Sequence, residues 1–198
     1  MAIASASTVP VPELIRRGYD RAKGLGHDGM PALKAEHRQF LAGLLGQEVK
    51  ALPAPMDMAA CPWVVFEPEL FVQAYVPGAN LRAQAALLGL LQQEGPQQLV
   101  VSHPWLMRAV EAIQRAGFDV RQAALWVATM TVLPRWEAPG AVSPDGHEGV
   151  ALGAAERAAL NLMPAATGLG AAALVCARES ALAQVAGAVW PDATVLQV

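Results

Sequence analysis

Short apolar runs alternate with helix-patterned segments through the second half of the chain, and this order limits the possible folds more than any other feature. WVVF at 63–66 and QQLVVSH at 97–103 are the first two runs, and residues 172–176 and 194–198 form the last two. Runs of this length are typical of buried strands. Their alternation with helices is typical of a parallel sheet. The sequence therefore predicts a helix-rich α/β fold with a few short, mostly parallel strands.

The abundance of alanine makes an all-α fold the alternative. Alanine is the best helix former and is depleted in strands. The segment 120–133 shows the conflict, because its apolar residues share one face of a helix and also form a continuous run that fits a buried strand. Its length favours the helix, but the pattern leaves both alternatives open.

Polar residues and prolines mark the expected ends of several elements. Residues 134–149 are rich in turn formers and are expected to form a loop. The segment 154–163 is expected to form a helix that Pro164 ends. Three polar residues are expected to cap the helices that follow them: Asn80, Ser102 and Ser180.

The chain length of 198 residues suits one domain. Hydrophobic residues make up 54% of the chain and charged residues 16%, which favours a buried core over a disordered chain. We expect residues 1–10 to be disordered and 11–198 to form a single globular domain. Within it, 11–46 is a helical N-terminal part, and 62–198 is the main body after a proline-rich linker.

Charge, hydropathy and cysteine content limit the classes of partner and compartment. A net charge of −3 argues against a nucleic-acid partner. The N-terminus lacks the pattern of a secretory signal, and no apolar stretch approaches the ~20 residues of a membrane helix, so no membrane insertion is expected. Cys61 and Cys176 are expected to be buried and reduced, which favours a cytoplasmic location.

The sequence predicts no metal site and no cofactor. No two histidines have the spacing of one helical turn, and no CxxC pair is present. The glycines of GLGHDG at 24–29 match a dinucleotide-binding spacing, but they follow an expected helix instead of a strand. We therefore interpret that segment as a turn.

Candidate catalytic residues follow the first two expected strands. Glu67 and Glu69 come directly after 63–66, and His103 follows the second strand. The carboxyl ends of strands carry the site in open parallel sheets. If the protein is an enzyme, these three residues are its candidate acid–base groups. The alternative interpretation is a pair of solvated carboxylates in a loop.

A second group of candidates lies in the expected loop at 134–149. Trp136 stands beside Arg135, and exposed tryptophan and arginine are typical anchors of protein interfaces. His147 lies later in the same segment, next to Glu148. We predict Arg135, Trp136 and His147 as binding residues.

The second half of the chain resembles a known family. The residues that carry the resemblance are LLGLLQQEG at 87–95, the leucine-patterned helix pair from LMRAVEAIQRAGFDV to Pro134, and GLGAAALVCARESALAQVAGAVWP after the loop. This order is similar to the type III secretion sorting-platform adaptor family (SctK/OrgA-like). The aromatic–proline segment that the family carries early has its counterpart only at 66–77. The resemblance implies an all-helical, non-catalytic adaptor.

The absence of a catalytic motif favours a non-enzymatic interaction protein, an adaptor or subunit of a larger assembly. Its partner would be another protein or a second copy of the same chain. The alternative is a small cytoplasmic α/β enzyme that acts on a small molecule through Glu67, Glu69 and His103. A pocket that holds titratable side chains with perturbed pKa values would favour the enzyme.

Overall fold

The computed structural model describes residues 9–24, 60–74, 79–92, 98–130, 135–138 and 151–198. Five strands form one sheet in the order β3-β2-β1-β4-β5, and every pairing is parallel. The fold is therefore α/β and helix-rich, as the alternation of apolar runs predicts. The strands are β1 (Trp63–Phe66), β2 (Gln98–Val101), β3 (Arg135–Glu137), β4 (Ala172–Cys176) and β5 (Thr194–Gln197).

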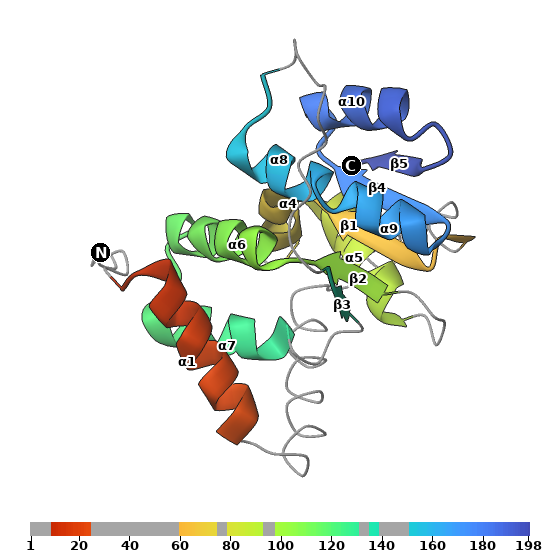
Figure 1. Ribbon diagram of the computed structural model, residues 1–198. Coiled ribbons are helices and arrows are strands. Elements are labelled where there is room, and N and C mark those ends of the chain that lie inside the picture. Colours follow the sequence, from red (N-terminus) through yellow and green to blue (C-terminus); the bar gives the residue numbers. More distant parts are fainter. Residues whose placement is uncertain (1–8, 25–59, 75–78, 93–97, 131–134, 139–150) are drawn as a thin grey trace.

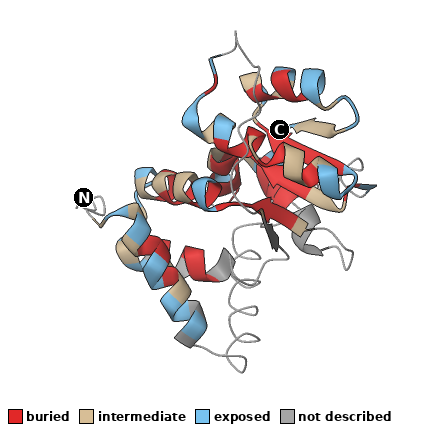
Figure 2. Cartoon of the chain, viewed as in Figure 1, coloured by how far each residue is buried: buried red, intermediate tan, exposed pale blue. Residues whose placement is uncertain are grey.

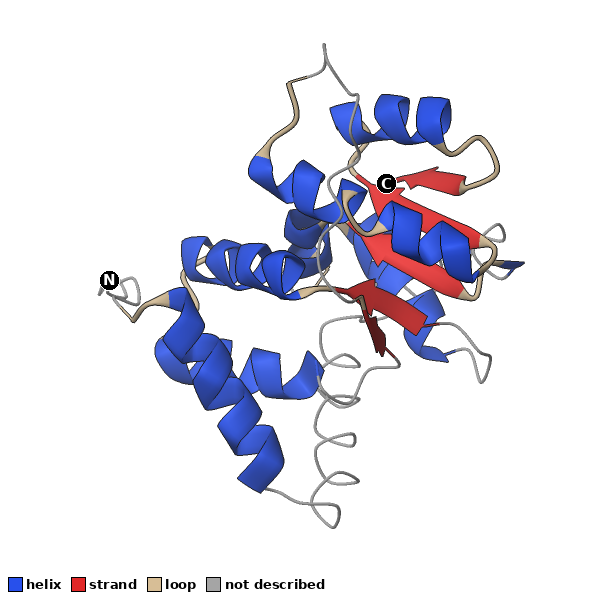
Figure 3. Ribbon diagram, in the orientation of Figure 1, coloured by secondary structure: helices blue, strands red, loops and turns tan. Residues whose placement is uncertain are grey.

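Helices surround this sheet, with α9 in front of it and α5 behind it (Figure 1, Figure 3). Asn80, Ser102 and Ser180 cap α5, α6 and α10 through side-chain oxygens that accept backbone N–H groups, which confirms the three predicted caps. The helices are α1 (Val11–Gly24), α4 (Pro68–Gln73), α5 (Leu81–Gln92), α6 (His103–Arg115), α7 (Val120–Met130), α8 (Ala154–Leu160), α9 (Met163–Leu169) and α10 (Ala181–Val189).

The segment 120–133, for which the sequence left helix and strand both possible, is helical from Val120 to Met130, so the helix prediction is confirmed there. The predicted loop at 134–149 is wrong at its start, because residues 135–137 form β3, which pairs with β2. The three residues of β3, two of which are charged, do not show the apolar pattern of a buried strand. They form a strand because they pair with β2.

The predicted helix at 154–163 ends earlier, at Leu160, and Pro164 does not stop a helix. It lies in the first turn of α9, where proline loses no hydrogen bond. Pro68 has the same place in α4, a helix that the sequence analysis left unassigned. In the N-terminal part, α1 accounts for 11–24, and the remainder of the predicted 11–46 lies outside the described residues.

The centre of the sheet is the most buried part of the described chain (Figure 2). All residues of β4 are buried, and so are Val64, Val65 and Phe66 of β1. Continuous burial is expected for parallel strands that are covered on both faces. An aromatic cluster joins the end of β1 to the helices, with Phe71 edge-on to Phe66 and to Trp105 at centroid distances of 5.3 Å.

The order of the strands creates a change of direction beside β1. The chain runs from β1 to β2 to β3 on one side and then returns to β4 on the other side. In open α/β sheets, ligands bind outside the carboxyl ends of the strands at such a point. Here the residue that follows β1 is Glu67, whose N–H donates to the carbonyl of Val175 in β4 at 2.9 Å.

The first helix packs against α7, far along the chain (Figure 1). The crossing is close at Gly18, because a Cβ atom there would lie 2.4 Å from the Cβ of Val127. Leu14 and Ile15 of α1 are buried in the same core as Trp126. The described part of the N-terminal helical region is therefore joined to the main body.

Candidate functional site

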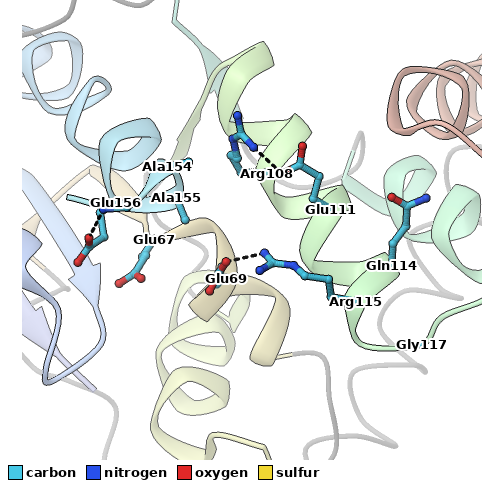
Figure 4. A pocket seen from close by; sticks show the side chains of 11 residues that line it. Glu67, Glu69, Arg108, Glu111, Gln114, Arg115, Gly117, Ala154, Ala155 and Glu156 are labelled. Atoms are coloured by element: carbon cyan, nitrogen blue, oxygen red, sulfur yellow. Dashed lines mark hydrogen bonds and ion pairs between the residues drawn. The ribbon is translucent and has the colours of Figure 1, made fainter. Parts of the chain in front are cut away.

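A cavity of about 820 Å³ lies at the carboxyl edge of the sheet, between α4, α6 and the start of α8 (Figure 4). Its position next to the end of β1 agrees with the place where open parallel sheets bind ligands. Its volume is within the range of small-molecule sites. The residues that line it are Glu67, Glu69, Arg108, Glu111, Gln114, Arg115, Gly117, Gly153, Ala154, Ala155 and Glu156.

Glu67 is the most buried carboxyl group of this cavity, with 8% of the residue exposed. Burial raises the pKa of Glu67, and the negative charges of Glu156 and Glu69 raise it further. The hydrogen bond from the Ala177 N–H, at 3.1 Å, acts in the opposite direction, and so does the nearby Ser180 hydroxyl. The balance leaves a carboxyl that holds its proton to higher pH than an ordinary glutamate, as an acid–base group requires.

Glu156 at the start of α8 lies at the same end of the cavity (Figure 4). It accepts hydrogen bonds from the Ser180 hydroxyl and from the Gly153 N–H, both at 2.7 Å. Burial raises its pKa, but these hydrogen bonds outweigh that effect, so the pKa of Glu156 lies below its ordinary value. Glu67 and Glu156 therefore have pKa values shifted in opposite directions, an arrangement that separates an acid from an ionised carboxylate.

The wall opposite these carboxyl groups is one face of α6. Arg108 and Glu111 form an ion pair at 2.7 Å along this helix. Arg115 forms a second ion pair with Glu69 of α4, which crosses the cavity edge. These side chains are partly exposed, so each pair adds little to stability. The two ion pairs hold the guanidinium groups of Arg108 and Arg115 in position.

Of the three predicted catalytic residues, the structure brings two to the cavity. Glu67 and Glu69 line it, whereas His103 does not. His103 is the exposed first residue of α6, on the strand end next to the cavity. The interpretation of Glu67 as a solvated loop carboxylate is wrong, because the residue is buried.

The predicted binding residues do not join this site in the described structure. Arg135 and Trp136 belong to β3 and not to a loop, because their backbones pair with Leu99 and Val100. β3 is an edge strand on the far side of β2 from the cavity strand β1. The third residue, His147, lies outside the described residues.

Several cavity residues were missed by the sequence analysis. Ser180 does not line the cavity but holds Glu156 through a hydrogen bond, and it follows β4 by four residues, so the strand-end rule that found Glu67 could have found it as well. Glu156 reaches the cavity because α8 packs against α6 and α4, and no local pattern reports that packing. Arg108 and Arg115 are seven residues apart and share one face of α6, but the sequence does not show what faces them.

Two side chains near the strand ends, Ser102 and Cys176, carry groups that could act as nucleophiles, but neither is activated. The Ser102 hydroxyl accepts a hydrogen bond from the Trp105 N–H at 3.3 Å and acts as a helix cap. Burial and the charges of Glu67 and Glu156 raise the pKa of Cys176 to about 12. A thiol with this pKa is not a nucleophile at neutral pH. The chemistry of the cavity therefore depends on its carboxyl and guanidinium groups.

Within the described ranges, no three His, Cys, Asp or Glu side chains are arranged to hold a metal ion. No helix of that part of the chain is both long and apolar enough to span a bilayer. Comparison of the chain with protein family models, curated proteins and solved structures finds no match.

Proposed function

We propose that the protein is a small α/β enzyme that binds a small polar molecule in this cavity and uses Glu67 as its acid–base group. The observation that carries the proposal is the position of one buried carboxyl, 8% exposed, on the wall of a cavity of about 820 Å³ beside the carboxyl end of the central strand. Proteins seldom bury a carboxyl group unless it is paired or functional.

The reaction supported by these groups is proton transfer. A raised pKa makes Glu67 a stronger base than an ordinary glutamate and keeps part of it protonated nearer to neutral pH. Glu156 stays ionised and adds a fixed negative charge next to it. The substrate would be a molecule small enough for the cavity, with a group that gains or loses a proton.

Saturation-transfer NMR with a library of small polar molecules tests the proposal. The wild-type chain is compared with Glu67→Gln, which keeps the shape of the side chain, and with Glu179→Gln as the matched control. Glu179 is exposed after β4 and does not line the cavity. We expect ligands that bind the wild type and the control but not Glu67→Gln. Ligands that bind all three chains equally would contradict the proposal.

A second candidate function is a non-enzymatic adaptor or subunit, and the outer edge of β5 favours it. This edge strand, TVLQ at 194–197, has no charged residue and no proline, which are the features that protect strand edges from pairing with another chain. The resemblance to the type III secretion sorting-platform adaptors implies an all-helical fold, and that expectation is wrong, because the described chain contains a five-stranded sheet. A partner from that assembly stays a prediction from the sequence alone. Light scattering at increasing protein concentration tests self-association, and a constant mass of 20.8 kDa would count against it.

The compartment we expect for either function is the cytoplasm. Both cysteines are buried and neither forms a disulfide, and a chain with unbridged thiols suits a reducing compartment.

A further inference from the structure

The charges around the cavity do not balance. Among the described residues, four glutamates and two arginines line it, with no lysine or aspartate. A site that binds a charged ligand usually presents the opposite charge to it. The distribution of these six charges therefore bears on the kind of molecule that the cavity accepts.

Both arginines already have a carboxylate as ion-pair partner. Arg115 is paired with Glu69, and Arg108 is paired with Glu111 at 2.7 Å. Each pair brings its own compensating carboxylate, so α6 presents ion pairs instead of free positive charge. An anionic ligand would have to compete with Glu69 and Glu111 for these guanidinium groups.

The two remaining carboxyl groups, Glu67 and Glu156, have no positive partner among the described residues, whose ion pairs all involve other side chains. Their hydrogen bonds come from neutral donors, namely the N–H groups of Ala177 and Gly153 and the hydroxyl of Ser180. Neutral donors orient a carboxylate but leave its charge uncompensated. This end of the cavity is thus negative.

We propose that the ligand is an organic cation, a small molecule with a protonated amine that lies between Glu67 and Glu156. An ammonium group has three N–H donors and no acceptor, so it can donate to both carboxylates at once. Its positive charge would replace the missing counter-charge. The inference rests on the proposed function and gives that site its substrate class.

Binding of the cation should be linked to the charge of Glu67. A protonated Glu67 cannot attract an ammonium group, so the cation binds after the carboxyl proton leaves to solvent. In the part of the chain that the structure describes, the charged or titratable groups that face Glu67 are Glu69 on α4, Glu156 on α8 and the Cys176 thiol on β4, and none of them supplies a positive charge. Affinity should therefore rise with pH through the titration of Glu67.

Three probes of equal chain length test the substrate class: butylammonium, butan-1-ol and butyrate. Binding is followed through the ¹³C resonances of the glutamate carboxyl groups. We expect butylammonium to bind and to shift the resonance of Glu67, and the alcohol and the anion not to bind. Glu67→Gln should weaken butylammonium binding about tenfold or more, because a charged hydrogen bond is lost. Glu179→Gln should bind it like the wild type.

The outcomes separate the substrate class from the site itself. Binding of butyrate or butan-1-ol in the cavity, without butylammonium, would overturn the cation proposal and leave the proposed site in place. An equal affinity of butylammonium for wild type and Glu67→Gln would also overturn it. If none of the three probes binds, the cation proposal is contradicted, whereas the proposed function is contradicted only if the library of small polar molecules also yields no ligand that depends on Glu67.

Discussion

The indole N–H of Trp105 donates a hydrogen bond of 2.7 Å to the main-chain oxygen of Phe66. Phe66 is the last residue of β1, and the paired register of β1 and β2 extends only to Val64 and Leu99. The indole thus takes the place of a strand donor at the point where the two strands separate. Because Glu67 is the next residue, this hydrogen bond fixes the backbone from which the buried carboxyl projects.

The first prediction concerns the loss of this hydrogen bond in Trp105→Phe. The variant keeps an aromatic ring against Phe71 but leaves a buried carbonyl without its donor. We expect the free energy of unfolding to fall by about 1–3 kcal/mol, measured by urea denaturation. A variant as stable as the wild type would show that water or another group satisfies the Phe66 carbonyl.

The second prediction concerns the crossing of α1 and α7 at Gly18. Alanine is a better helix former than glycine, but a Cβ at this position would lie 2.4 Å from the Cβ of Val127. We expect Gly18→Ala to lower the free energy of unfolding by about 1–3 kcal/mol, because the helices must move apart. Thermal or urea unfolding measures the change.

Gly187 in α10 provides the matched control for Gly18. A Cβ there would have no heavy atom within 4 Å. Gly187→Ala is therefore expected to raise the free energy of unfolding by about 0.5–1 kcal/mol. If Gly18→Ala raised the free energy of unfolding as Gly187→Ala is expected to do, the close crossing at Gly18 would be refuted.

The third prediction is a pH dependence of stability that comes from Glu67. Its pKa is raised above 4.5 in the folded chain, so between 4.5 and the raised value the folded state binds more protons than the unfolded state. Stability from this residue is present at low pH and is lost as pH rises through the raised pKa. In Glu67→Gln this loss is absent, so the variant should gain stability relative to wild type as pH increases.

Urea denaturation of both chains over a series of pH values measures this effect. The quantity of interest is the difference between their free energies of unfolding, because shared titrations cancel in it. A difference that stays constant from about pH 4.5 upward would show that Glu67 has an ordinary pKa in the folded protein.

The fourth prediction concerns the two cysteines. Cys61 and Cys176 are buried, and the pKa of Cys176 is raised to about 12 by burial and by neighbouring carboxylates. We expect neither thiol to react with a thiol-specific disulfide reagent in the native protein, and both to react in denaturant. Rapid reaction of one thiol under native conditions would contradict the buried position of that residue.

The sequence predicted the elements whose signal is local. Residues 63–66 form a strand as expected, because a short β-branched and aromatic run between prolines has few other solutions. The sequence alone could not decide between helix and strand for 120–133. In the structure this segment packs against α1, and Trp126 and Val127 are buried there. The strand at 135–137 could not be predicted, because its partner β2 makes it.

The candidate site was also predictable only where its residues carry a local signal. Glu67 and Glu69 follow a strand, and a rule about strand ends found them. The same rule also selected His103, which follows β2 but does not line the cavity. The rule identifies residues near strand ends and does not say which of them face the cavity. Glu156 depends on the docking of α8 against two other helices, a tertiary relationship that one sequence does not carry.

The docking of α1 has a consequence for the order of folding. The side chain of Gln114 in α6 donates to the carbonyl of Val9, 105 residues earlier in the chain. During synthesis the first helix leaves the ribosome long before α6 and α7 have been made, and its apolar face has no native surface to cover it. Chain segments with such distant partners close late, because the entropy of a large loop must be lost first. The apolar face of the N-terminal helix therefore needs protection from aggregation until α6 and α7 have been made.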